Sequence, residues 1–160
     1  MRMRIRVGVG ALALSTVTLI CSNGGMAQEA DLQAQVEDLQ QRYEQAIAAQ
    51  DWAAMGSLFT QDATFLPITG GQLEGAEGIS VYHEQSGITA LDATSSHTER
   101  LGENLILDVG TFTATATSEA GDMPFEGEYL VLTEVGEDGL RMRRAVAFPT
   151  RQPPGAPAGQ

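Results

Sequence analysis

The sequence has no lysine, and all nine of its basic residues are arginine, against 21 acidic residues and a formal net charge of −12. This balance excludes the broad basic surface that non-specific nucleic-acid binding needs, and it disfavours docking on anionic lipid. The chain has a single cysteine, Cys21, and two histidines, His83 and His97. Neither a cysteine metal site nor a disulfide framework can be built from so few residues, so we expect no metal and no cofactor.

The first 27 residues are typical of a secretory signal peptide. Arg2, Arg4 and Arg6 precede an apolar stretch over 7–20, and a small-x-small cleavage site follows at 25–27. The apolar stretch is shorter than the ~20 residues of a membrane span. We therefore expect cleavage after Ala27, which makes the protein secreted or periplasmic with no membrane attachment. A lipoprotein modified on Cys21, or a retained anchor, is the alternative.

Removal of residues 1–27 changes the composition. Three arginines, no acid and the only cysteine leave, so the net charge falls from −12 to about −15. What remains is long enough for one domain with its own core, over 28–149. The stretch 150–160 contains three prolines and two glycines and is expected to be a disordered tail.

The first half of the domain has the spacing of helices. A helix over 31–50 is indicated by one stripe of apolar residues at steps of three and four: Leu32, Val36, Leu39, Tyr43 and Ile47. Asp51 is expected to cap a short second helix. A short strand at 62–66 and a third helix at 75–85 follow.

The second half changes to the two-residue period of strands. Gly110 lies where the apolar residues change parity, which predicts a bulge that bends the sheet. Helices followed by a bent antiparallel meander indicate an α+β domain with helices on one face of the sheet. Four strands are expected, at 91–101, 105–117, 123–135 and 140–148.

The last predicted hairpin raises two expectations. A turn at 136–139 pairs Glu134 with Arg141 and Val131 with Arg144, so Arg144 would lie on an apolar face. A guanidinium there needs an ion-pair partner, such as a carboxylate, or a polar cavity where it could hold a ligand oxygen.

Leu130 and Leu132 would then lie on the opposite face of the sheet. Because helices cover only one face, these leucines would meet water in a monomer. We therefore expect a second subunit to cover the outer sheet face, which makes a two-fold homodimer.

Several short motifs over roughly 32–148 carry a family resemblance: Arg42-Tyr43, Ala49-Gln50-Asp51, Leu58 to Phe65, Gly75 with Ile79, Gly127 with Tyr129, Asp138-Gly139 and Arg144. With these motifs the domain resembles the nuclear transport factor 2-like superfamily, which includes ketosteroid isomerases and SnoaL-like cyclases, and above all its uncharacterised secreted members. The resemblance implies a cone-shaped domain in which a strongly curved antiparallel sheet wraps three helices, with a pocket at the open end, usually in a dimer.

The residues of the steroid isomerase reaction are only partly present. The resemblance places one oxyanion donor on Tyr43 and a second near Glu128 or Tyr129. Its carboxylate base falls at Pro67, next to Leu66, and neither residue can carry a proton. Steroid isomerisation is therefore not expected.

Three residues are candidates for catalysis: His97, Tyr43 and Arg144. A histidine is the usual general base near neutral pH, but His97 pairs with Val109, whereas Asp108 pairs with Thr98 on the other face, so strand parity disfavours a His97–Asp108 dyad. His83, beside Tyr82 on the third helix, is expected at the surface. The residues expected to line a ligand pocket are Tyr43, Trp52, Phe59, Phe65, Tyr82, Tyr129 and Arg144.

Three functions remain open at this point. The first is a secreted or periplasmic domain that binds a small apolar molecule. The second is an isomerase, cyclase or dehydratase that acts on a small apolar carbonyl compound without metal or cofactor. The third is a purely structural dimerisation domain with a filled core. An open pocket of ~300 Å³ or more would favour the first two.

Overall fold

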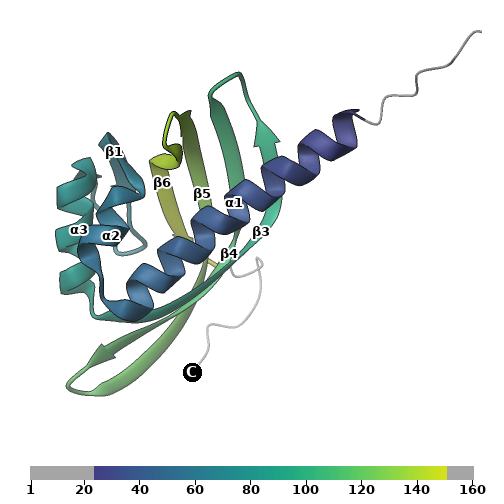
Figure 1. Ribbon diagram of the computed structural model, residues 1–160. Coiled ribbons are helices and arrows are strands. Elements are labelled where there is room, and N and C mark those ends of the chain that lie inside the picture. Colours follow the sequence, from purple (N-terminus) through teal and green to yellow (C-terminus); the bar gives the residue numbers. More distant parts are fainter. Residues whose placement is uncertain (1–23, 151–160) are drawn as a thin grey trace, which may run out of the picture.

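The computed structural model describes residues 24–150, and in it three helices pack on one face of a strongly curved sheet (Figure 1). Residues 1–23 of the expected signal peptide and 151–160 of the expected tail lie outside the described residues. None of the described helices is both long enough and apolar enough to cross a membrane.

The helices form where spacing and capping predict them. They are α1 (Gly24–Ala49), α2 (Trp52–Ser57) and α3 (Gly75–Ser86). The Asp51 side chain accepts a hydrogen bond of 2.9 Å from the Ala54 amide and so caps α2, as expected. The predicted stripe of α1 is confirmed, because Leu32, Val36, Leu39 and Ile47 are buried and Tyr43 is half-buried.

The six strands lie in the order β2-β1-β6-β5-β4-β3. The last four strands form the expected antiparallel meander, and β1 joins its edge in parallel with β6. The strands are β1 (Phe59–Leu66), β2 (Leu73–Glu74), β3 (Ile88–Arg100), β4 (Leu105–Ser118), β5 (Gly121–Gly136) and β6 (Gly139–Pro149).

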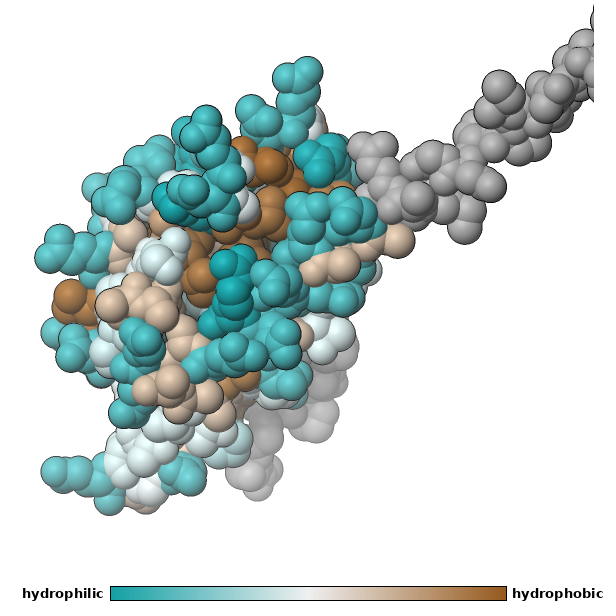
Figure 2. Space-filling view, in the orientation of Figure 1, coloured by the Kyte–Doolittle hydropathy of each residue, from teal (hydrophilic) through white to brown (hydrophobic). Residues whose placement is uncertain are grey.

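The concave face of the sheet holds the core. Helix α1 crosses this face diagonally, and α2 and α3 lie beside it near β1 (Figure 1). Figure 2 looks onto the helical side and shows apolar side chains gathered along the upper edge of α1, where the helix meets the sheet. The core cluster joins α1 residues such as Leu39 to Met55 of α2, Ile79 of α3 and Met142 of β6.

Two glycines in the middle of the sheet are covered by aromatic rings of the neighbouring strand. Gly110 of β4 pairs with Tyr129 of β5, and Gly127 of β5 pairs with Phe112 of β4. A Cβ atom on Gly110 would lie 2.1 Å from the Thr94 carbonyl oxygen and 2.6 Å from the Tyr129 hydroxyl. Only glycine therefore lets the strands and the tyrosine ring approach this closely.

One bulge lies elsewhere than the sequence predicted. In β4 the inward residues alternate without interruption through Gly110, and the register shift lies in β3, where Ser95 pairs with Gly110 and His97 with Val109. The extra residue is Ser96. The parity change in β4 was misread because Leu107 and Val109, although apolar, lie on the outer face.

A second bulge corrects the predicted register of the last hairpin. Glu134 pairs with Arg141 as expected, but Leu132 pairs with Arg144 and Thr133 with Met142, so Arg143 is the extra residue. A one-residue slip moves every later side chain to the opposite face. Arg144 therefore lies on the outer face with Leu132, and Ala145 takes the inward position opposite Val131 that was predicted for Arg144.

Candidate functional site

A cavity of about 400 Å³ lies between α1, α3 and the concave face of the sheet. Its wall is mainly apolar and includes Phe112, Ala114 and Phe125. The exposed residues Thr69 and Met123 are part of the lining, so the cavity opens to solvent beside them. A volume of this size, with few polar groups, is typical of a site for a small molecule.

The first polar group on the wall is a pair formed by Tyr43 of α1 and His83 of α3. The Tyr43 hydroxyl lies 2.6 Å from Nε2 of His83, and His83 Nδ1 lies 2.8 Å from the Ile79 carbonyl oxygen. Phe65 stacks on the imidazole at 5.4 Å between ring centroids, and Tyr82 meets its edge. The aromatic neighbours and the Ile79 carbonyl hold the imidazole in one orientation.

These contacts determine which atoms carry hydrogens. A carbonyl oxygen only accepts, so Nδ1 of His83 carries the proton and donates it to Ile79. Nε2 of the neutral ring is then an acceptor, and the Tyr43 hydroxyl donates to it. Burial lowers the pKa of His83 from its ordinary 6.5, which keeps the ring neutral. Burial also raises the pKa of Tyr43, with a smaller contribution from Tyr82.

The lowered pKa of His83 makes the stability of the fold depend on pH. Below about 6.5 the unfolded chain binds a proton at this histidine and the native chain does not. The free energy of unfolding is therefore expected to fall as the pH falls from 6.5 towards the native pKa, by up to ~1.4 kcal/mol per pH unit. Urea denaturation between pH 7 and about 5, where carboxyl groups contribute little, measures this slope.

The variant His83→Phe is expected to lose this slope, because it keeps a ring against Phe65 but cannot bind a proton. His97→Gln is the matched control: His97 is exposed, with 61% of its side chain accessible, and its replacement should leave the slope unchanged. Equal slopes in the wild type and His83→Phe would contradict this assignment.

The second polar group is centred on the Asp108 carboxylate of β4, which is 2% exposed. Tyr129 and the Gln40 amide donate to its Oδ2 at 2.8 and 2.9 Å, and Thr98 donates to its Oδ1 at 2.9 Å. The Tyr129 hydroxyl in turn accepts from Gln40. Burial is the main cause of a raised pKa at Tyr129. Neutral donors thus satisfy the carboxylate, and the described ion pairs give it no cationic partner.

Five of the seven residues expected in the pocket line the cavity: Tyr43, Phe59, Phe65, Tyr82 and Tyr129. Trp52 is not part of the lining and instead packs against the core from α2, where its carbonyl accepts a hydrogen bond from Ser80. The expected His97–Val109 and Thr98–Asp108 pairings are both confirmed. His97 is exposed and lies 3.6 Å from Glu99, so the structure does not bring it to the cavity.

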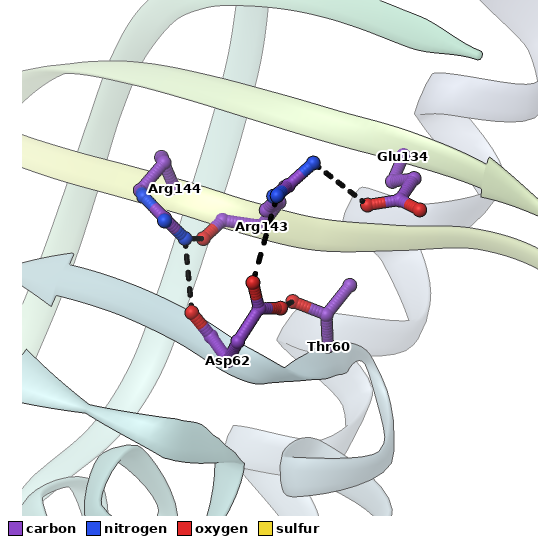
Figure 3. Close-up of polar contacts among 5 residues, drawn as sticks. All are labelled: Thr60, Asp62, Glu134, Arg143 and Arg144. Carbon is purple, nitrogen blue, oxygen red and sulfur yellow. Dashed lines mark hydrogen bonds and ion pairs between the residues drawn. The ribbon is translucent and has the colours of Figure 1, made fainter.

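Arg144 also lies away from the cavity, because the bulge at Arg143 turns it to the outer face. Its Nη1 donates to the backbone carbonyls of Asp62 and Arg143, at 2.9 and 2.7 Å (Figure 3). Neither Asp108 nor Glu128 pairs with it. Arg143 makes the ion pairs, at 3.6 Å to Asp62 and 3.3 Å to Glu134. The Thr60 hydroxyl chiefly, and then Arg143, lower the pKa of Asp62.

Sequence reasoning missed His83, Asp108 and Gln40. The expectation that His83 is a surface residue is wrong, since it is 2% exposed. The spacing of Ala76, Ile79 and His83, at steps of three and four, was the signal that could have placed it inside. Asp108 has the parity of the inward-facing residues of β4, but the misread bulge hid this.

The chemistry available at the cavity is hydrogen bonding and proton transfer. The neutral His83 can accept a proton through Tyr43 at the wall of this mainly apolar cavity. Within residues 24–150 there is no group of three or more histidine, cysteine or carboxylate side chains that could hold a metal ion.

Comparison with known proteins identifies a family. The model of the SnoaL-like domain matches residues 28–146, which is most of the chain and includes every polar residue of the cavity. No curated protein matches the sequence.

Several solved structures share the fold. A function-unknown protein from Mycobacterium tuberculosis has a TM-score of 0.67 at 16% identity, over 82% of this chain and 79% of that one. A ketosteroid isomerase-like protein from Erwinia carotovora atroseptica has a TM-score of 0.64 at 14% identity, over 74% and 96%. A domain of unknown function with a cystatin-like fold, from Nostoc punctiforme, has a TM-score of 0.65 at 13% identity, over 77% and 80%. At these identities the likeness extends to the fold alone.

Proposed function

The chain belongs to the SnoaL-like domain family, and from this membership and its cavity we propose that it binds a small, mainly apolar molecule between α1, α3 and the sheet. One observation carries the proposal: the cavity of about 400 Å³, lined mainly by aromatic and aliphatic side chains and open to solvent. A purely structural domain would fill this volume, because an apolar void costs stability.

Native mass spectrometry of the protein purified from its source organism tests the proposal. We expect an added mass on the folded chain that denaturation releases. Ala114→Phe places a ring in the cavity and should remove the added mass, because Ala114 is part of the lining. Thr113→Phe is the matched control, since Thr113 is the neighbouring exposed residue of β4 and points the other way. No added mass on the wild type, or retention in Ala114→Phe, would contradict the proposal.

We further propose that the protein works outside the cytoplasm, after cleavage of residues 1–27. The charged start, apolar stretch and small-residue site of this segment support the proposal. The mass of the chain in the same spectrum decides it. A chain that begins at Gln28 is expected, and a full-length or lipid-modified chain would contradict it.

A second copy of the chain is the partner we propose for the outer sheet face. The bulge at Arg143 makes this face more apolar than the sequence suggested, because it brings Val146 and Phe148 beside Leu130. Phe148 is 41% exposed. The outer apolar face consists of Leu107, Val109, Leu130, Leu132, Val146 and Phe148. The native spectrum should show a dimer, and Leu130→Glu should convert it to a monomer that still carries the ligand.

A second candidate function is acid–base catalysis of the isomerase, cyclase or dehydratase type. The observation that favours it is the neutral His83, whose Nε2 lies 2.6 Å from Tyr43 at the cavity wall. If the protein is an enzyme, the molecule released from the wild type should differ from the one released from His83→Phe, because the variant would retain unconverted substrate.

A further inference from the structure

Two tyrosines of the cavity already use their hydroxyl hydrogens in hydrogen bonds within the protein. Tyr43 donates its hydroxyl hydrogen to His83, and Tyr129 donates its hydrogen to Asp108 at 2.8 Å. Each hydroxyl has only one hydrogen, so neither has one left for a ligand. What Tyr43 still offers is the lone pairs of its oxygen.

The direction of the Tyr43 bond is determined by the backbone of α3. Nδ1 of His83 must carry a proton because its neighbour at 2.8 Å is the Ile79 carbonyl oxygen, which can only accept. In the neutral ring Nε2 is then the acceptor. The rings packed against His83 are Phe65, Tyr43 and Tyr82, and the described ion pairs include no carboxylate partner for it. The packing thus favours the neutral ring, in agreement with the lowered pKa of His83.

Building on the proposed function, we infer that the ligand is an alcohol, enol or amine that donates a hydrogen bond to the Tyr43 oxygen, and that the cavity discriminates against a carbonyl compound of the same shape. A carbonyl oxygen placed there would face lone pairs and lose its hydrogen bond with water without replacement. The sequence predicts the opposite role for Tyr43, namely that of a hydrogen-bond donor to a ligand oxygen.

Other polar groups on the wall do not create this preference. Thr133 is 1% exposed and lines the cavity, but its hydroxyl can donate or accept and so does not discriminate. Tyr82 lies 3.2 Å from Thr69 at the exposed end, where water is available to both. The Asp108 carboxylate can only accept hydrogen bonds, and Gln40, Thr98 and Tyr129 already donate to it.

Three rigid bicyclic compounds of one shape test the inference: borneol, an alcohol; camphor, the corresponding ketone; and bornane, the hydrocarbon. Their dissociation constants are measured by isothermal titration calorimetry, with bornane measured by competition. We expect borneol to bind the wild type roughly tenfold more tightly than camphor, which is the effect of one hydrogen bond gained rather than lost.

Two variants and two matched controls locate the preference. His83→Phe removes the acceptor of the Tyr43 hydrogen, which can then turn to a ligand, so the ratio of the camphor to the borneol dissociation constant should fall to about one. Tyr43→Phe removes the oxygen and should bring the same ratio to one or below. Tyr82→Phe and Thr133→Val should keep it unchanged.

The outcomes separate the two proposals. If none of the three compounds binds the wild type, the proposed function and this inference both fail. If they bind and camphor binds as tightly as borneol or more tightly, the inference alone is overturned. The cavity would then accept apolar molecules without preferring a hydrogen-bond donor over an acceptor. A preference for borneol that His83→Phe leaves unchanged also overturns it.

Discussion

Replacement of Gly110 by alanine is expected to destabilise the fold by on the order of 4 kcal/mol or to prevent folding. The new methyl group would lie 2.1 Å from the Thr94 carbonyl oxygen of β3 and 2.6 Å from the Tyr129 hydroxyl of β5. The tyrosine ring could move, but the backbone carbonyl belongs to a paired strand and cannot move without breaking the β3–β4 ladder. Overpacking against backbone is costlier than against a flexible side chain.

The expected effect of Gly110→Ala is measured by urea denaturation of the purified variant, or by its yield of soluble protein if it does not fold. Gly102→Ala is the matched control, because Gly102 lies in the next turn towards the N-terminus, with nothing within 4 Å of the added Cβ position. Gly78→Ala, equally open and inside α3, should raise the stability by about 0.5–1 kcal/mol. A Gly110→Ala variant as stable as Gly102→Ala would mean that β3 and Tyr129 do not approach Gly110 this closely.

The second large effect is expected at Asp108. Asp108→Ala removes the common acceptor of Gln40, Thr98 and Tyr129, so the Thr98 and Tyr129 hydroxyls lose the carboxylate to which they donate, whereas Gln40 keeps Ser95 as an acceptor. Each buried donor without a partner costs about 1–3 kcal/mol. We expect a loss of about 3 kcal/mol or more in the free energy of unfolding, with partial recovery in Asp108→Asn, which keeps one acceptor oxygen.

Chemical denaturation measures the loss, and Asp138→Ala is the control. Asp138, in the turn between β5 and β6, is also a carboxylate with an ion-pair partner, Arg141 at 3.3 Å, but its side chain is 83% exposed. Its replacement should change stability by less than ~1 kcal/mol, because exposed ion pairs contribute little. If Asp108→Ala lost no more than Asp138→Ala, the three hydrogen bonds to Asp108 would not stabilise the fold.

Much of the fold follows from patterns that neighbouring residues create. The helical stripe of α1, the Asp51 cap and the turns that separate β3 to β6 were all predicted, and the structure has them. The family resemblance was also confirmed by the SnoaL-like match over 28–146. The helical stripe, the cap and the turns each depend on residues that are close in the chain, so a single sequence is enough to reveal them.

The candidate site was predicted only in part, and Arg144 shows why. Its position on the concave or outer face depends on one extra residue, Arg143, in the β5–β6 pairing. Turn chemistry places the end of the hairpin but does not indicate a bulge four residues beyond Gly139. Sequence alternation on both sides of the bulge is consistent with either register, so only the paired backbone distinguishes them.

By itself, the sequence determined the order of the three helices and of every strand except β2, the aromatic character of the cavity wall and the position of Tyr43 on the inward stripe of α1. Only the tertiary structure decided that Tyr43 meets His83, that Asp108 faces inward with Gln40 and Tyr129, and that Arg144 faces outward. Periodicity tells which side of an element is buried. Hydrogen-bond partners that are distant in the chain depend instead on how α1 crosses the curved sheet and on single-residue slips in strand pairing.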